Sequence, residues 1–117
     1  MIKLKHKKLK VWKLAIELTA NIYRITEKFP KTEMYGLTSQ LQRAVVSIPS
    51  NIAEGASRSS AKERKRFYEI ARSSLVEVDT QLEIAIQLNY LQDENEALED
   101  QLNHVFAMLS NLIKKPG

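Results

Sequence analysis

The sequence predicts an all-α fold, an antiparallel up-down bundle of four helices in a single domain of residues 1–117. Every long segment spaces its apolar residues three and four positions apart, and none shows the sustained alternation of a half-buried strand. Short connections join these segments, which favours packing of consecutive helices as antiparallel neighbours. With 44% hydrophobic and 27% charged residues, a chain of 117 residues is long and apolar enough to close one core.

The first helix is predicted over residues 9–28, after a basic N-terminal extension of residues 1–8. Its apolar residues form two faces at helical spacing. One face holds Trp12, Ala15, Ile16, Thr19, Ile22, Tyr23 and Thr26, and the other holds Val11, Leu18 and Ile25. A bundle helix needs only one apolar face, so the second face predicts a further interface. Phe29 and Pro30 end the helix, because a residue that precedes proline is disfavoured in the helical region.

The second helix is predicted over residues 38–55, with an apolar face that runs along its whole length. This face holds Leu37, Leu41, Ala44, Val45, Ile48 and Ile52. Pro49 lies inside the segment and removes one backbone donor, so we expect a kink or a break into two pieces there. Gly55 is expected to end the helix in a left-handed cap.

The third and fourth helices are predicted over residues 61–89 and 94–113. Ser60 and Glu63 form a capping box at the start of the third helix, and Asp93 is expected to cap the fourth. The third helix also carries a second apolar face, which contains Tyr68 and Leu75. Together the second faces of the first and third helices predict an oligomer interface at Val11, Leu18, Ile25, Tyr68 and Leu75.

The chain lacks the signatures of a cofactor, a metal site or an enzyme. The absence of cysteine excludes thiolate nucleophiles and cysteine-based zinc sites and fits a reducing compartment, and His6 and His104 are too few for a histidine-rich metal site. There is no glycine-rich phosphate loop, no Gly-x-Ser-x-Gly elbow and no His-Glu-x-x-His motif. Apolar runs fall far short of the roughly 20 residues of a membrane span. We therefore expect a cytoplasmic protein that is not an enzyme and does not contact membranes.

The net charge of +4 hides an asymmetry between the two parts of the chain. Residues 1–72 contain 16 of the 18 Lys and Arg residues and 6 of the 14 acids, whereas residues 73–117 have a net charge of −6. Such asymmetry indicates an anionic partner, or unlike surfaces that dock when copies of the chain associate. The third interpretation is that these charges are simply solvated.

Two basic clusters are the candidate nucleic-acid-binding residues. They are Lys3, Lys5, Lys7, Lys8, Lys10 and Lys13 in the N-terminal run, and Arg58, Lys62, Lys65, Arg66 and Arg72 around the start of the third helix. Clustered lysines and arginines neutralise phosphates and release counterions, which gives salt-sensitive binding without sequence preference. A frayed, solvated terminus explains the first cluster equally well.

The chain resembles a known bacterial family along residues 9–113. The resemblance is carried by Val11-Trp12, Ile22-Tyr23, Phe29-Pro30, Tyr35-Gly36-Leu37 and above all by the run Gln40–Gly55, with Arg58 after it. These motifs are similar to those of the four-helix-bundle proteins encoded in intervening sequences of 23S ribosomal RNA genes. The resemblance implies a homopentameric ring and an association with ribosomal RNA, and it supplies no catalytic residue. A related branch is the accessory variability determinant of diversity-generating retroelements, a basic pentamer that engages nucleic acid and a reverse transcriptase.

The most specific part of the resemblance also forms a candidate polar network. Its residues are Ser47, Pro49, Ser50, Asn51, Glu54, Gly55 and Arg58. Asn51, Glu54 and Arg58 lie three and four positions apart, so their side chains share one helix face. They form a ligand site or a polar centre of the ring, or they satisfy the backbone groups that Pro49 frees, or they pair across subunits; the structural roles are favoured.

Two functions are therefore compared. The first is a non-enzymatic, oligomeric bundle that binds RNA or DNA backbones through the two basic clusters. The alternative is an interaction scaffold that docks a partner protein without nucleic acid, with the charge asymmetry serving assembly. Phosphate contacts weaken steeply as salt rises, whereas apolar packing hardly changes, so salt dependence separates the two.

Overall fold

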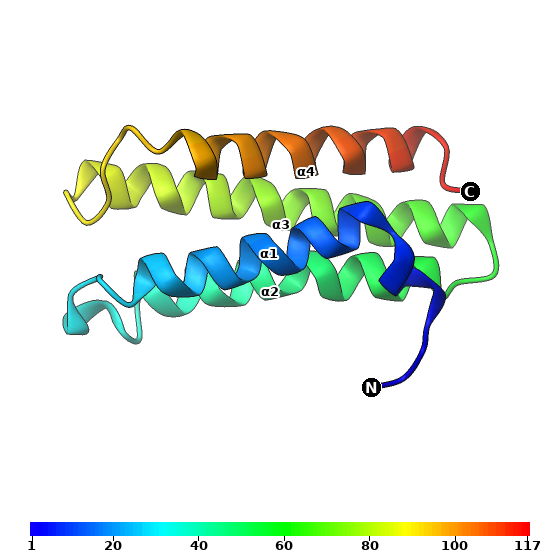
Figure 1. Cartoon of the computed structure of the whole chain (residues 1–117), viewed down its shortest axis with the longest axis horizontal. Helices are drawn as coiled ribbons and strands as arrows, with labels where there is room; N and C mark the ends of the chain where they lie inside the picture. Colours follow the sequence, from blue (N-terminus) through cyan, green and yellow to red (C-terminus); the bar gives the residue numbers. More distant parts are fainter.

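The computed structural model describes residues 1–117 and consists of four long α-helices and two short 3₁₀ helices. In chain order these are η1 (Lys5–Lys8), α1 (Lys10–Thr26), η2 (Lys31–Glu33), α2 (Leu37–Ala56), α3 (Ala61–Gln87) and α4 (Glu96–Lys114). Successive long helices run in opposite directions (Figure 1). The all-α prediction is confirmed, and each long helix begins and ends within two residues of the predicted position.

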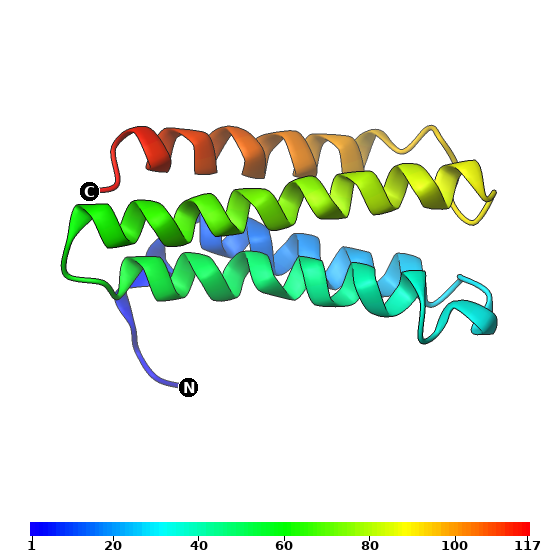
Figure 2. The same cartoon turned by 180° about the vertical axis from the view of Figure 1, so that it is seen from behind.

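The four helices enclose one apolar core in a body of 43 × 26 × 20 Å. α2 and α4 each pack against both α1 and α3, so the helices form a square in which each touches its two neighbours (Figures 1 and 2). The largest fully buried side chains come from all four helices: Leu18, Ile22, Leu41, Val45, Ile48, Ile52, Val78, Val105 and Leu109. The apolar residues that recur at helical spacing in each helix therefore form the core of the chain, as the sequence predicts.

The predicted oligomer interface is wrong for four of its five residues, which lie inside the single chain. Val11, Leu18, Tyr68 and Leu75 are at most 3% exposed, and only Ile25 is partly accessible. The buried residues of α1 come from both predicted apolar faces. A helix has apolar residues on a wide arc when two neighbours flank it, as α2 and α4 flank α1.

Pro49 does not break α2, which continues from Leu37 to Ala56. Proline has no backbone N–H, so the carbonyl four residues earlier, that of Val45, loses its helical donor. The hydroxyl of Thr19 in α1 lies 3.3 Å from this carbonyl oxygen and 2.8 Å from the carbonyl oxygen of Ala15. The single proton of this hydroxyl is therefore shared between the nearer Ala15 carbonyl and the carbonyl that Pro49 frees. The sequence offers Asn51, Glu54 and Arg58 for this role as one of several alternatives.

Gly55 does not form the predicted left-handed cap, because it lies within α2 and is buried. A Cβ atom at this position would lie 2.8 Å from Cε1 of Tyr68 and 3.0 Å from Cβ of Phe67, both in α3. Glycine is therefore needed for the close approach of α2 and α3. The left-handed cap occurs instead at Asn89 (φ 62°), where the amides of Asn89 and Tyr90 bond to carbonyls of the last turn of α3.

Two further helix starts test the capping predictions. The Ser60 hydroxyl accepts a hydrogen bond of 3.2 Å from the amide of Glu63, as the predicted cap of α3 requires. The cap of α4 is Asn95, which accepts from the amide of Leu98 at 3.2 Å, so the assignment of this cap to Asp93 is wrong. Asparagine and aspartate are nearly equal as N-caps, so residue type alone does not decide between Asp93 and Asn95.

Candidate nucleic-acid interface

The helix directions bring separate basic segments to one end of the molecule. The N-terminal segment, the connection between α2 and α3, and the C-terminus all lie at this end (Figure 1). η1 packs against both α1 and α2, which places the first basic cluster beside the end of α2. In an up-down arrangement the start of α1, the start of α3 and the end of α4 must coincide, so segments more than 50 residues apart in sequence become neighbours.

Nine lysines and arginines form what we call the basic end. They are Lys3, Lys5, Lys8 and Lys10, then Lys62, Lys65 and Arg66, and finally Lys114 and Lys115, and all nine are exposed. The structure contains one ion pair, between Glu54 and Arg58, so no residue of the basic end is neutralised by a carboxylate. Seven of the nine belong to the predicted clusters, and Lys13, also predicted, is exposed one turn along α1.

Three of the predicted basic residues are engaged within the chain. Lys7 donates to the carbonyl of Ile2. Arg58 donates to Glu54 at 2.9 Å and lies over the ring of Phe67, 4.6 Å from its centroid.

Arg72, the third of these residues, packs onto α4. Its guanidinium lies 5.8 Å from the centroid of the Phe106 ring and donates to the Ser110 hydroxyl at 3.2 Å. Arg72 therefore joins α3 to α4, and we do not include it in the basic end.

Arg64 holds the C-terminus against the connection between α2 and α3. Its Nε donates to the carbonyl of Pro116 at 2.8 Å, and its Nη1 lies 3.0 Å from the carbonyl oxygens of Arg58 and Ser59. This contact keeps Lys114 and Lys115 beside the start of α3. Sequence reasoning did not place these two lysines in the candidate interface, and only the direction of α4 could have indicated them.

The residues of the polar network contact one another and the neighbouring helix. The hydroxyls of Ser47 in α2 and Ser74 in α3 are 2.8 Å apart, and Nδ2 of Asn51 donates to the carbonyl and the hydroxyl of Ser47 at 2.8 and 2.9 Å. Asn51 therefore turns toward Ser47 and does not meet Glu54 and Arg58, which pair with each other. The Ser47–Ser74 bond and the close approach at Gly55 hold α2 against α3, whereas the bonds of Asn51 lie within α2.

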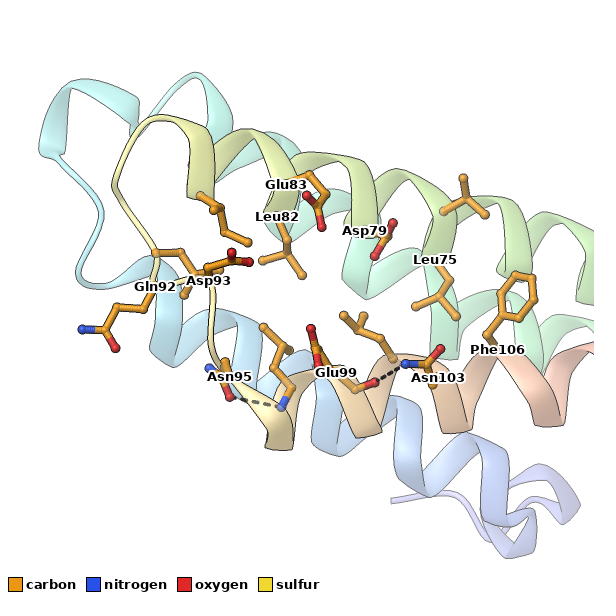
Figure 3. A pocket seen from close by; sticks show the side chains of 15 residues that line it. Leu75, Asp79, Leu82, Glu83, Gln92, Asp93, Asn95, Glu99, Asn103 and Phe106 are labelled. Carbon is orange, nitrogen blue, oxygen red and sulfur yellow. Dashed lines mark hydrogen bonds between the residues drawn. The ribbon is translucent and has the colours of Figure 1, made fainter.

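Between α3 and α4 lies a groove of about 480 Å³ that we call the acidic groove. Leu75, Leu82 and Leu98 are among its apolar lining residues, whereas its charged lining residues are Asp79, Glu83, Asp93 and Glu99. Figure 3 shows carboxylates of α3 and α4 on either side of the gap between the two helices. No lysine or arginine lines the groove, and four of the eight acids of residues 73–117 lie here.

At the end opposite the basic end, a tyrosine joins the two long connections. The Tyr90 hydroxyl donates to Oε2 of Glu33 at 3.0 Å, and its ring packs against Phe29 with centroids 5.6 Å apart. The hydrogen bond to Glu33 is the main cause that raises the pKa of Tyr90. Burial raises the pKa of Tyr68 at the α2–α3 contact, with the charge of Arg64 acting in the opposite direction.

No group of three or more His, Cys, Asp or Glu residues is arranged to hold a metal ion. None of the helices combines the length and the apolar character that crossing a membrane requires.

The fold and the candidate interface define a four-helix, all-α protein with a basic end and an acidic groove. The family model described as "23S rRNA-intervening sequence protein" matches residues 7–111, and the chain belongs to this family. Its structure is similar to a Bacteroides thetaiotaomicron crystal structure described as a protein with unknown function from the S23 ribosomal protein family. The TM-score is 0.78 at 22% sequence identity, with 90% of this chain and 99% of the other covered. No curated protein matches the chain.

Proposed function

We propose that the protein binds the phosphate backbone of RNA through its basic end and catalyses no reaction. The observation that carries the proposal is the convergence of the N-terminal segment, the start of α3 and the end of α4, which gathers nine exposed cationic side chains without ion-pair partners. A cationic surface of this kind neutralises several phosphates at once and releases their counterions. The description of the family suggests structured ribosomal RNA as the first probe. In this proposal the protein acts in the cytoplasm, and DNA backbones bind by the same contacts.

The proposal includes self-association, with a pentameric ring as the arrangement that the family resemblance implies. Each copy in such an assembly presents one basic end. Several weak phosphate contacts on one RNA then act together, because binding of the first copy raises the effective concentration of the others. Exposed apolar side chains remain available for contacts between copies, since Ile70, Ile84 and Leu88 lie along one outer face of α3.

A titration by fluorescence anisotropy tests the RNA proposal. A structured ribosomal RNA fragment and an unrelated RNA are compared at several salt concentrations. We expect log Kd to rise linearly with log salt, with a slope of roughly 0.7–0.9 for each phosphate neutralised. A preference for the ribosomal fragment would add specificity, and lack of binding at low salt overturns the proposal.

Charge-reversal variants locate the contact. The double variant Lys62→Glu/Lys65→Glu changes the basic end, and Lys28→Glu/Lys31→Glu makes the same change of net charge near the opposite end of α1. We expect the first variant to lose RNA affinity and to show a smaller salt slope, since each lost phosphate contact lowers the slope by about one. Equal losses in both variants would show that only net charge matters and would remove the basic end as the site.

The alternative function is a scaffold that docks a partner protein. The outer face of α3 favours it, because Ile84 and Leu88, one helical turn apart, are 44% and 48% exposed there. A partner bound on this face keeps its affinity as salt rises, in contrast to RNA bound at the basic end.

A further inference from the structure

The acidic groove combines an apolar floor with carboxylates that have no partner. Val76 and Phe106 remain 52% and 43% exposed at its border. Asp79, Glu83 and Glu99 line the same space (Figure 3), and none of them forms an ion pair. Because no cationic side chain lines the groove, its complement is a segment that carries both apolar and cationic groups.

The N-terminal segment of the chain carries both kinds of group. Ile2 and Leu4 are 72% and 46% exposed, and they alternate with the exposed Lys3 and Lys5. The backbone at Leu4 is extended (φ −105°, ψ 151°). In an extended segment alternate side chains point to opposite sides, so Ile2 and Leu4 share one side and Lys3 points to the other, and Lys5 follows as the first residue of η1.

The dimensions of the segment and the groove agree. Along α3 the groove extends from Leu75 to Ile86, which at 1.5 Å per residue is about 16 Å. The four residues before η1 span about 13 Å when extended, since each adds roughly 3.3 Å, and Lys5 follows directly. Residues 1–5 therefore cover most of the groove, with Ile2 and Leu4 over its apolar residues and the lysines toward the carboxylates at the border.

Within one chain, residues 1–5 lie on a different side of the bundle from the acidic groove. η1, which follows the segment, packs against α1 and α2, whereas the groove lies between α3 and α4. In Figure 1 the chain before η1 leads away from the bundle. The matching segment must then come from a second copy.

We propose that the acidic groove of one copy receives residues 1–5 of a second copy. This inference deepens the self-association proposed above, on which it rests, by naming the two surfaces. The contact joins unlike surfaces, so every copy keeps one segment and one groove for further neighbours. Such a head-to-tail contact closes into a ring or continues as a filament, depending on the rotation between copies.

The mass of the protein in solution tests the contact. Light scattering over a range of concentrations compares the unchanged chain with Asp79→Lys/Glu83→Lys. The control is Glu17→Lys/Glu27→Lys, which changes the net charge equally at exposed positions in α1 and at its C-terminal end, outside the groove and away from the outer face of α3. We expect the groove variant to weaken association by about tenfold or more, and the control to assemble as the unchanged chain does.

A charge exchange provides the second test. The variant Lys3→Glu/Lys5→Glu should also dissociate, and its combination with Asp79→Lys/Glu83→Lys in one chain should restore assembly. The variant Ile2→Ser/Leu4→Ser tests the apolar part of the contact. Both side chains are exposed in the isolated chain, so circular dichroism should show an unchanged fold.

The outcomes separate this inference from the proposals on which it builds. Assembly that persists in the groove variant, or that fails equally in the control, overturns the segment-in-groove contact and leaves self-association through another face intact. A monomer at every concentration overturns both. In this contact Lys3 and Lys5 face the neighbouring copy, so RNA is bound by the other seven residues of the basic end. RNA binding is measured independently, because the Lys62→Glu/Lys65→Glu variant leaves the segment and the groove unchanged.

Discussion

The contact between Thr19 and the Val45 carbonyl permits a quantitative test of how α2 tolerates Pro49. Thr19→Val keeps the branched shape of the side chain and removes only its hydroxyl. Val45 is fully buried, so its carbonyl then lacks a donor from protein and solvent, a loss that costs about 1–3 kcal/mol. The 3.3 Å separation is at the long end for a hydrogen bond, so we expect about 1–2 kcal/mol, or a fall in Tm of about 4–8 °C.

A double-mutant cycle isolates this interaction from other effects of the substitution. Pro49→Ala supplies a new amide at position 49, which can donate to the Val45 carbonyl as in an uninterrupted helix. In the Pro49→Ala background the Val45 carbonyl has this second donor. Thr19→Val should therefore lower the free energy of unfolding by less than about 0.5 kcal/mol. Urea unfolding followed by circular dichroism gives the four free energies. An equal cost of Thr19→Val in both backgrounds would refute the reasoning.

Three further predictions concern the α2–α3 contact. Gly55→Ala should lower the free energy of unfolding, because overpacking against Tyr68 costs about 1–3 kcal/mol and exceeds the gain in helix propensity of about 1 kcal/mol; a rise in Tm would contradict it. Ser60→Ala removes the bond to the Glu63 amide and should cost about 1 kcal/mol in urea unfolding, whereas Ser60→Asp should preserve stability. Burial raises the pKa of Tyr68, so the unfolded chain loses its proton first and stability falls as pH rises above about 10; Tyr68→Phe should make this fall smaller, and an unchanged pH profile would exclude Tyr68 as its source.

The sequence by itself determined the local structure of the chain. The spacing of apolar residues set four helices to within two residues at each end, because helical hydrogen bonds and side-chain periodicity are local. The Ser60 cap of α3 followed from residues three positions apart. The charge asymmetry was also visible in the sequence, since it requires no knowledge of neighbours.

The tertiary structure decided what each local feature contacts. Val11 and Leu18 belong to the core because α2 and α4 flank α1 on both sides, and no pattern within α1 contains that information. Gly55 was misinterpreted for the same reason, since the atoms that require glycine belong to α3. The basic end exists because helix directions bring distant segments together, and the acidic groove exists because α3 and α4 leave a space between them. These properties depend on the packing of whole helices, which residues close together in sequence do not specify.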